Sequence, residues 1–558
     1  MPAEAAKGRA VCCLFLALGL LAGVARAQDW PMYLGDLSHT SHTANGFQIS
    51  ASNLPQMQQL WRTNVGATIS TGATASNGSL YVGAWDGNFY SIDAATGNVL
   101  WQTFVGMAPS PPDTTCMPGI GVSSQSVVSG DTVYVGGGDS AVYALNRLTG
   151  ETRWRLPLAD PQAGAYLWSS MMLSGNALYV GIASLGDCPL VQGGLARIPL
   201  DDPTHPLIRY TVPDGSAGAS IWSTPAIDEQ AGLVYVTTGN ADSQDAGAGV
   251  WGSALLVMDA ATLEIRGYFF LPIAPGDADV DFGSSPTLFQ TPNGRQFVAA
   301  NGKDGMMYVL TRPRLSLAWK FKLAIDCISP ELGCGSVSTP AFDGRTLFSG
   351  AGQSDLTASD PGSVYAINPV TQKQLWMYTA RGIVLGPVTL TPGLINVPTT
   401  KGLVILDAGS GAELWNDSDT IGLYSQVAAA NGALYCTYVN GDIAAWGIPG
   451  GGADSVLTAT PGGLSFEGVS GGRAPAPQTI SVSSQADPQT FTVSSDSAWL
   501  TAGSATADTP FALSVVVEIA GLAPGGYRGN LTLTPSSGGR PIVVPVSLRV
   551  TPAARPDR

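Results

Sequence analysis

The chain has 558 residues, a formal net charge of −15 at pH 7 and only 12% charged residues, while Gly (69) and Pro (39) are abundant. This negative balance makes nucleic acid and anionic membrane surfaces poor partners. Sparse charge, frequent turn formers and many Val, Thr, Tyr and Trp residues favour an all-β protein, and no convincing amphipathic helix is present.

Residues 1–27 have the layout of a secretory signal. Lys7 and Arg9 precede the apolar run Val11–Val24, and a small-residue site ends at Ala27. This order predicts cleavage after Ala27. A retained anchor is the alternative, but about fourteen apolar residues are short for a bilayer span. No later stretch could cross a membrane, so we expect a secreted or periplasmic protein.

Five cysteines remain beyond this signal, in a compartment where disulfides form. Cys327 and Cys334 share one short loop and are expected to pair. Cys116 with Cys188 is the second expected pair. Cys436 lies in the strand-like run ALYCTYV and is predicted to be a buried free thiol.

A four-stranded unit recurs along the chain. In one copy, the β-type runs Ile221–Ile227, Leu233–Thr238 and Ala254–Asp259 are followed by a turn and the aromatic run Arg266–Phe270. Eight second strands can be counted, but only seven aromatic fourth strands. The eighth is found at the other end of the chain, in QQLWRTNVG with Trp61.

The repeat therefore predicts an eight-bladed β-propeller spanning residues 28–450 and closed by the N-terminal strand. Closure removes the exposed sheet edges that an open array would leave. The aromatic residues of the fourth strands are expected to fill the space between blades.

A second domain is expected after a linker at 451–455. Short strands rich in Ser, Thr and Val fill residues 456–551, which predicts a small immunoglobulin-like β-sandwich, and 552–558 should be a disordered tail. The segments LTATPGGLSFEG, SSDSAWLTA around Trp499 and GLAPGGYRGNLTL around Tyr527 resemble the BACON family of immunoglobulin-like modules. The resemblance implies adhesion to a glycan or protein surface, and a simple spacer is the alternative.

Only three histidines are present, so a His-rich metal site or a Ser-His-Asp triad is hard to build. His39 and His42 lie in DLSHTSHT and are expected to be solvated or locally hydrogen-bonded. No C-x-x-C-H segment occurs, and no attached haem is expected.

The recurring strand, Asp-x-x-Thr-Gly turn and Trp resemble the pyrroloquinoline quinone (PQQ) repeat family. Trp222 stands six residues before Asp228, and a later strand ends in Thr-Gly-Asn at Asn240, as in the quinoprotein alcohol dehydrogenases and the related polyvinyl alcohol dehydrogenases. The resemblance implies that Trp222 stacks on the quinone and Asn240 ligates calcium. Lys303, in NGKDGMMYVL, would hydrogen-bond the quinone oxygens. A planar anionic cofactor needs such a platform, a cation and a hard metal.

Two residues of the family's site have no direct counterpart. We place the family's catalytic Asp near residues 248–250, where this chain has no carboxylate. Asp245 is therefore the expected catalytic base and second calcium ligand, with Asp242 close to it. Gln192 is the neutral stand-in expected for a calcium-binding Glu of the family.

An acidic run follows the fourth strand of the same repeat. Asp277, Asp279 and Asp281 have D-x-D-x-D spacing, which is typical of a solvated loop and could also bind calcium.

Two functions compete on these residues. The first is a dehydrogenase that oxidises an alcohol, polyol or polymer with PQQ and calcium and passes electrons to an external acceptor. The second is a non-catalytic propeller that binds a protein or glycan, in which Trp222 is core packing and Asn240 and Lys303 are turn residues. The missing Asp and Glu favour the second function. The agreement of three positions in consecutive blades favours the first.

Overall fold

The computed structural model describes most of the chain beyond the N-terminal segment. The described residues are 29–43, 47–111, 113, 116–241, 243–273, 280–326, 333–355, 360–417, 420–449, 457–484, 489–536 and 541–552. The predicted signal sequence and its cleavage site lie outside them. The described residues contain no α-helix, only the short 3-10 turns η1 (Leu54–Gln56), η2 (Pro161–Ala163) and η3 (Ala246–Ala248). None of the helices in these ranges is long and apolar enough to cross a membrane.

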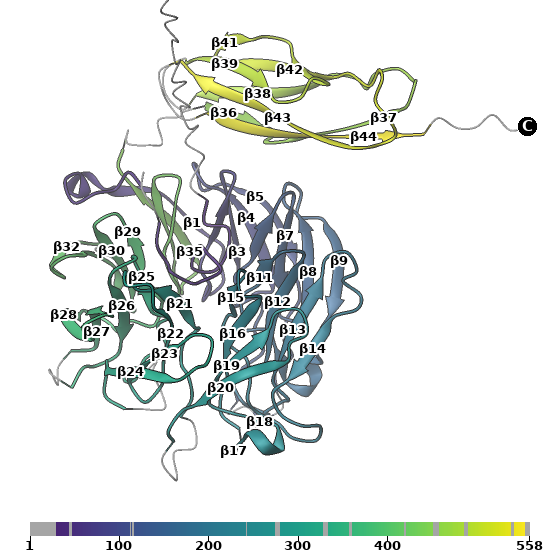
Figure 1. The fold of residues 1–558 in the computed structure, drawn as a ribbon. Coiled ribbons are helices and arrows are strands. Elements are labelled where there is room, and N and C mark those ends of the chain that lie inside the picture. The colour runs from purple at the N-terminus through teal and green to yellow at the C-terminus, as the bar shows by residue number, and fades with distance from the viewer. Residues whose placement is uncertain are drawn as a thin grey trace, which may run out of the picture.

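The first 35 strands build eight antiparallel sheets and one hairpin (Figure 1). The first four sheets are β2–β5 (Thr74–Ser76, Ser79–Gly83, Asn88–Asp93, Val99–Phe104), β6–β9 (Val127–Ser129, Thr132–Gly136, Ala141–Asn146, Thr152–Pro157), β10–β14 (Ala165–Tyr166, Met172–Ser174, Ala177–Ser184, Gly194–Pro199, Leu207–Tyr210) and β15, β16, β19 and β20 (Ala226–Asp228, Leu233–Thr237, Ala254–Asp259, Ile265–Phe270). The small hairpin is β17 (Gln244–Asp245) with β18 (Val250–Trp251).

The other four sheets continue the same order. They are β21–β24 (Thr287–Gln290, Gln296–Asn301, Met306–Thr311, Leu317–Lys322), β25–β28 (Ala341–Phe342, Leu347–Ala351, Gly362–Asn368, Lys373–Ala380), β29–β32 (Thr389–Thr391, Leu394–Thr399, Gly402–Asp407, Glu413–Asn416) and β33–β35 (Ala428–Ala430, Ala433–Thr437, Asp442–Gly447) joined by β1 (Gln58–Asn64). Strand β1 pairs antiparallel with β35, so the fourth strand missing from the end of the repeat comes from the N-terminus, as Trp61 predicts.

The first strand of the repeat unit is shorter than predicted. The sequence suggests a strand over Ile221–Ile227, but β15 comprises only Ala226–Asp228. The reason lies in Thr224 and Pro225: the Thr224 amide donates to Ser285 Oγ instead of a ladder partner, and Pro225 has no amide hydrogen.

Several sheets are fixed to the next by an aromatic side chain and a glycine turn. The Trp61 indole donates from Nε1 to the carbonyl of Ala94, 3.0 Å away in the turn after β4. Gly97 ends that turn with φ +76°, and a Cβ there would lie 2.5 Å from the Trp61 ring. Trp101 and Gly150 repeat the arrangement one sheet further on. The predicted packing of these aromatics between sheets is therefore present at these positions.

Polar side chains form a belt along the inner strands. The backbone amide of Gln125 donates to Ser170 Oγ, that of Ser170 to Thr224 Oγ1, and that of Thr224 to Ser285 Oγ. The Ser285 amide continues to Thr339 Oγ1 at 3.2 Å. Each step links one sheet to the following one, so the inner edges of five consecutive sheets are joined by direct hydrogen bonds.

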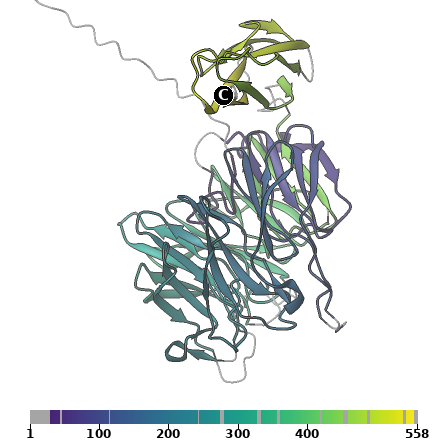
Figure 2. The ribbon, with the colours of Figure 1, turned by 90° about the vertical axis from the view of Figure 1, so that its right-hand side faces the viewer.

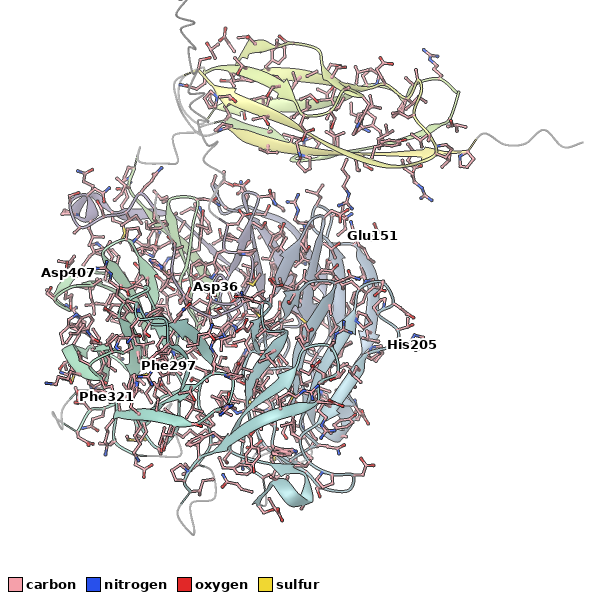
Figure 3. The ribbon with its side chains drawn as sticks, in the orientation of Figure 1. Asp36, Glu151, His205, Phe297, Phe321 and Asp407 are labelled. Atoms are coloured by element: carbon pink, nitrogen blue, oxygen red, sulfur yellow. A yellow bond between two sulfur atoms is a disulfide. The ribbon has the colours of Figure 1, made fainter. Side chains whose placement is uncertain are left out.

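The eight sheets follow one another in a ring, in which the last sheet packs against the first. The N-terminal segment, residues 29–43, crosses from sheet to sheet along the inner edge of this ring. It pairs through Trp30 with Ala75 of β2, and its later carbonyls accept hydrogen bonds from inner-strand amides up to Leu390 of β29, six sheets in all. Asp36, from this segment, is labelled near the centre of the ring in Figure 3. We name residues 29–43 the crossing segment.

His39 of the crossing segment is fully buried, which corrects the expectation that it is solvated or bonded locally. Its Nδ1 donates to the carbonyl of Pro286, 2.8 Å away and 247 positions further along the chain. The Tyr33 ring meets the imidazole edge-on at 5.1 Å. Burial lowers the pKa of His39 to about 4.

Beyond the ring, nine strands form two sheets around a separate apolar core. One sheet comprises β36 (Leu457–Thr460), β38 (Gln478–Ser484), β42 (Phe511–Val517) and β40 (Leu500–Ala502), and the other β37 (Leu464–Val469), β44 (Ile542–Thr551), β43 (Gly525–Pro535), β39 (Thr490–Ser495) and β41 (Thr506–Asp508). Figure 2 shows this part, in yellow, next to the sheets drawn in purple and light green.

The cysteines largely follow the sequence prediction. Cys116 and Cys188 form a disulfide, and Cys436 is a buried free thiol. Cys334 is also disulfide-bonded. Its predicted partner, Cys327, lies outside the described residues, so that pairing stays a prediction.

Candidate functional site

Trp222, Asn240 and Lys303 come from three connections on one side of the ring. Trp222 lies between β14 and β15, Asn240 follows β16, and Lys303 follows β22. In antiparallel sheets of this order, the turn after the second strand and the link to the next sheet fall on the same side. The Lys303 Nζ lies 5.9 Å from the centroid of the Trp222 ring, within the range of a cation–π contact.

Asp281 is the carboxylate at the centre of this group. Its Oδ1 lies 3.1 Å from Lys303 Nζ, and its side chain is only 2% exposed. The backbone amide of Asn240 donates to Oδ2 at 3.3 Å, and the backbone amide of Lys303 donates to the Asp281 carbonyl at 3.0 Å. The ion pair compensates the cost of burying the carboxylate.

Gly239 lets the backbone lie close to both the carboxylate and the indole. A Cβ at this position would lie 3.3 Å from Asp281 Oδ2 and 3.5 Å from Trp222 Cδ1. Its amide donates to the Ser220 carbonyl, and its carbonyl accepts from the Ser253 amide, so the backbone is held on both sides. A side chain at this position would press on both Asp281 and Trp222, so the close packing of these groups depends on the glycine.

The Asn240 side chain, next in the chain, is half-buried. Its carbonyl accepts from the Ala219 amide at 2.6 Å, so the backbone is committed to the fold. Within the described residues, the side-chain amide makes no hydrogen bond. It can offer its oxygen to a ligand or a metal ion.

Asp304 fixes the turn that presents Lys303. Its Oδ1 accepts from the Met306 amide, and its Oδ2 accepts from the Tyr308 hydroxyl at 2.5 Å. Burial raises the pKa of Asp304. This carboxylate is committed to the turn, which leaves Asp281 to pair with Lys303.

Asp245 and Gln192 lie apart from these contacts. Asp245 is exposed on the β17–β18 hairpin, and its carboxylate accepts from the Gly247 and Ala248 amides at the start of η3. Gln192 donates from Nε2 to the Val212 carbonyl at 3.0 Å. Its backbone bridges Gly218, which in turn bridges Ala241 beside Asn240. Among the residues that the structure describes, no contact joins either side chain to the group around Asp281.

The described residues hold no group of three or more His, Cys, Asp and Glu side chains that could bind a metal ion. Asp242, Asp277 and Asp279 lie outside the described residues. A cation at Asp281 would find one carboxylate and the Asn240 amide, whereas calcium takes about six to eight oxygen ligands. The protein donors in this part of the chain supply only part of a calcium shell.

Sequence reasoning placed Asp281 in an acidic run and gave it no role beside Asn240. A usable signal was present, because Asp281 stands between Val280 and Phe282 and opens the approach to β21. Both apolar neighbours are buried, with 6% and 0% exposure. An acidic residue enclosed by buried residues needs a partner, and Lys303 provides it.

The comparisons with known proteins identify the family of this chain. A family described as outer membrane protein assembly factor BamB, a PQQ-repeat family, matches residues 43–182 and 316–460, about half of the chain. The β-propeller domain of glucose, ethanol and alcohol dehydrogenases matches residues 208–314, which include Trp222, Asn240, Asp281 and Lys303. The chain belongs to the PQQ-repeat β-propeller family.

Two similar sequences are polyvinyl alcohol dehydrogenases. One from Pseudomonas sp. is 24% identical over 68% of this chain, and one from Sphingopyxis sp. is 23% identical over 76%. The chain spans 66% and 68% of their lengths, about two thirds. A quinohemoprotein alcohol dehydrogenase from Pseudomonas putida is 24% identical over 48% of this chain.

Solved structures share the fold at low identity. The quinohemoprotein alcohol dehydrogenase of Comamonas testosteroni aligns with a TM-score of 0.62 and 17% identity, covering 76% of this chain and 81% of that protein. BamB from Moraxella catarrhalis aligns with a TM-score of 0.50 and 16% identity, covering 70% of this chain and 99% of that protein. These likenesses establish a β-propeller-like fold.

Proposed function

We propose that this protein is a quinoprotein-like dehydrogenase that oxidises an alcohol or polyol with PQQ at the Asp281 site. The observation that carries the proposal is the meeting of Trp222, Asn240, Asp281 and Lys303 beside Gly239. The sequence relatives that are alcohol and polyvinyl alcohol dehydrogenases support the same class of activity.

The residues present fit a planar anionic cofactor. Trp222 would supply the aromatic platform, and Lys303 the cation beside it. Asn240 would offer its side-chain oxygen to calcium, with the further ligands coming from outside the described residues. PQQ bound here would supply the two-electron oxidant that accepts hydride from the carbinol carbon.

Asp281, rather than Asp245, is our candidate for the proton acceptor. Its Oδ1 is paired with Lys303, while Oδ2 lies beside Gly239 and the Asn240 backbone amide. The substrate hydroxyl would give its proton to Oδ2 as the carbon–hydrogen bond breaks, and a carbonyl compound would leave. The exposed Asp245 is occupied by two backbone amides.

The two carboxylates give a matched test. Asp281→Asn should lower dye-linked alcohol oxidation of PQQ-loaded protein by roughly 10²- to 10⁴-fold, the usual range for a general base. Asp245→Asn should leave it near the starting value. Circular dichroism and the PQQ titration of each variant report the fold and the cofactor site separately. Equal activity of the two variants would overturn the assignment of Asp281.

A non-catalytic scaffold is the second candidate. It is favoured by the BamB-type family match and by the small number of metal donors beside Asp281. Titration of the purified chain with PQQ, with and without calcium, separates the two candidates. Saturable binding followed by tryptophan fluorescence supports the dehydrogenase. Absence of binding at tens of micromolar PQQ supports the scaffold.

We also propose the finer architecture on which this function rests. The eight sheets act as the blades of one closed propeller, and residues 456–551 act as a BACON-like adhesive module. Export to the periplasm or the medium, with cleavage after Ala27, would bring the protein to its substrate and to an external electron acceptor. N-terminal sequencing of the exported protein tests the cleavage, with Gln28 as the expected first residue.

A further inference from the structure

A groove on the outer side of the ring lies next to the insert that begins at the candidate site. It has a volume of about 410 Å³ and lies beside the outermost strands β14 and β20 of two neighbouring sheets. Figure 1 shows β14, β20 and the β17–β18 hairpin in the same region of the ring. The lining residues are Arg209, Trp251, Glu264, Ile265, Arg266, Gly267 and Tyr268.

Aromatic rings form one wall of this groove. The Trp251 ring meets Tyr268 at 5.2 Å and Phe270 at 6.2 Å, the latter with only 20° between planes. Tyr268 is 46% exposed although it belongs to the aromatic set that elsewhere packs between sheets. An exposed aromatic wall of this kind offers flat apolar faces to the carbon–hydrogen groups of a ligand.

The charges of the groove leave one donor available. Arg266 pairs with Asp259 at 3.3 Å and with Glu264 at 3.0 Å, so its charge is balanced. The Arg209 guanidinium has no ion-pair or hydrogen-bond partner within the described residues, and it is exposed. A chain that alternates hydrocarbon and hydroxyl groups matches apolar faces with a free donor beside them.

The groove is linked to the candidate site through the backbone. The β17–β18 insert starts at Asn240 and ends near Trp251, whose carbonyl accepts from the Thr238 hydroxyl at 2.6 Å. The Trp251 amide donates to the Thr211 carbonyl at 2.9 Å. One short insert therefore carries a candidate ligand residue at its start and the aromatic wall at its end.

We propose that this groove is a secondary binding site for a linear polyol, which holds a distant part of the chain whose hydroxyl reacts at Asp281. The proposal rests on the proposed function for its reaction, but binding in the groove needs no cofactor. A neutral polyol suits aromatic faces beside one unpaired donor, and the net charge of −15 on the protein would repel a polyanion.

Affinity electrophoresis of the full chain in gels containing poly(vinyl alcohol) tests the binding without PQQ. The unchanged protein should be retarded, and Tyr268→Ser and Arg209→Gln should each weaken retention by roughly five- to tenfold. Phe104→Ser is the matched control, because Phe104 is 61% exposed on the outermost strand of another sheet. Equal retention of all four proteins would overturn the proposal, as would retardation by dextran alone.

Kinetics of the PQQ-loaded protein give an independent measurement. The ratio of kcat/KM for poly(vinyl alcohol) to kcat/KM for 2-propanol should fall in Tyr268→Ser through a higher KM for the polymer. Phe104→Ser should keep the ratio of the unchanged protein. Polymer retention without any PQQ activity would leave the groove site standing and reject the dehydrogenase. Activity on 2-propanol without polymer retention would do the reverse.

Discussion

Burial of His39 should make the stability of this protein depend on pH in a predictable direction. Its imidazole lies in the crossing segment, fully buried, with Nδ1 donating to Pro286 and Nε2 without a hydrogen-bond partner in the described residues. Protonation would place a positive charge and an unsatisfied N–H group in a site shielded from bulk solvent. Desolvation by burial accordingly lowers the His39 pKa from 6.5 to about 4, and the more distant Asp36 opposes this only in part.

The direction of the effect follows from linkage. The unfolded chain binds a proton at His39 below pH 6.5, but the folded chain does so only below about pH 4. The stability that depends on neutral His39 is therefore complete above pH 6.5, falls as the pH decreases, and levels off below about pH 4. Between pH 7.5 and pH 5 the loss amounts to about 2 kcal/mol.

The assay is denaturant unfolding at these two pH values. In His39→Asn the side chain does not titrate, can still donate to Pro286 and tolerates the local φ of +62°. The pH-dependent loss of unfolding free energy should therefore be about 2 kcal/mol smaller in this variant than in the unchanged protein. His205→Asn is the control, since the His205 side chain is 81% exposed at the rim labelled in Figure 3. An equal pH dependence in His39→Asn and the unchanged protein would refute the reasoning.

Two further predictions concern stability. Lys303→Met leaves the Asp281 carboxylate buried without its cation and should lower the free energy of unfolding in urea by about 3–5 kcal/mol. Adding Asp281→Asn should restore part of this loss, and additive losses would contradict the pairing. Opening the Cys116–Cys188 disulfide by a double Ser substitution releases a link across 72 positions and should cost about 4 kcal/mol on the chain-entropy estimate. An unchanged melting temperature of the double Ser variant would count against that link.

Much of the ring could be predicted because its signals are local and repeated. Turn residues, second strands and fourth-strand aromatics recur, and the unpaired Trp61 strand indicated that the last sheet is completed from the N-terminus. The crossing segment has no such repeat. Its hydrogen bonds reach six different sheets, so no local pattern around His39 could indicate its burial.

The candidate site was predictable only where its residues belong to a recognisable pattern. Trp222, Asn240 and Lys303 stand at fixed places in consecutive repeats, and the structure brings these three together. Asp281 lies in a long loop, so its position relative to the strands could not be predicted from the sequence. Asp245 was favoured because it is close to Asn240 in sequence. Proximity in sequence does not determine which of two loop carboxylates faces inward. Here the Asp245 carboxylate caps the 3-10 turn η3 and stays at the surface.

Closure of the ring by β1 has a consequence for the timing of folding. Asn64 hydrogen-bonds Asp442, which lies 378 positions later in the chain. At typical synthesis rates the second residue emerges roughly 20 to 80 s after the first. During that interval strand β1 lacks its partner β35, and the crossing segment lacks most of its hydrogen-bond partners. An unpaired strand edge can associate with other chains. A chain that ends before β35 would leave the ring open with unpaired strand edges. Closure of the ring therefore depends on the last strand to be synthesised.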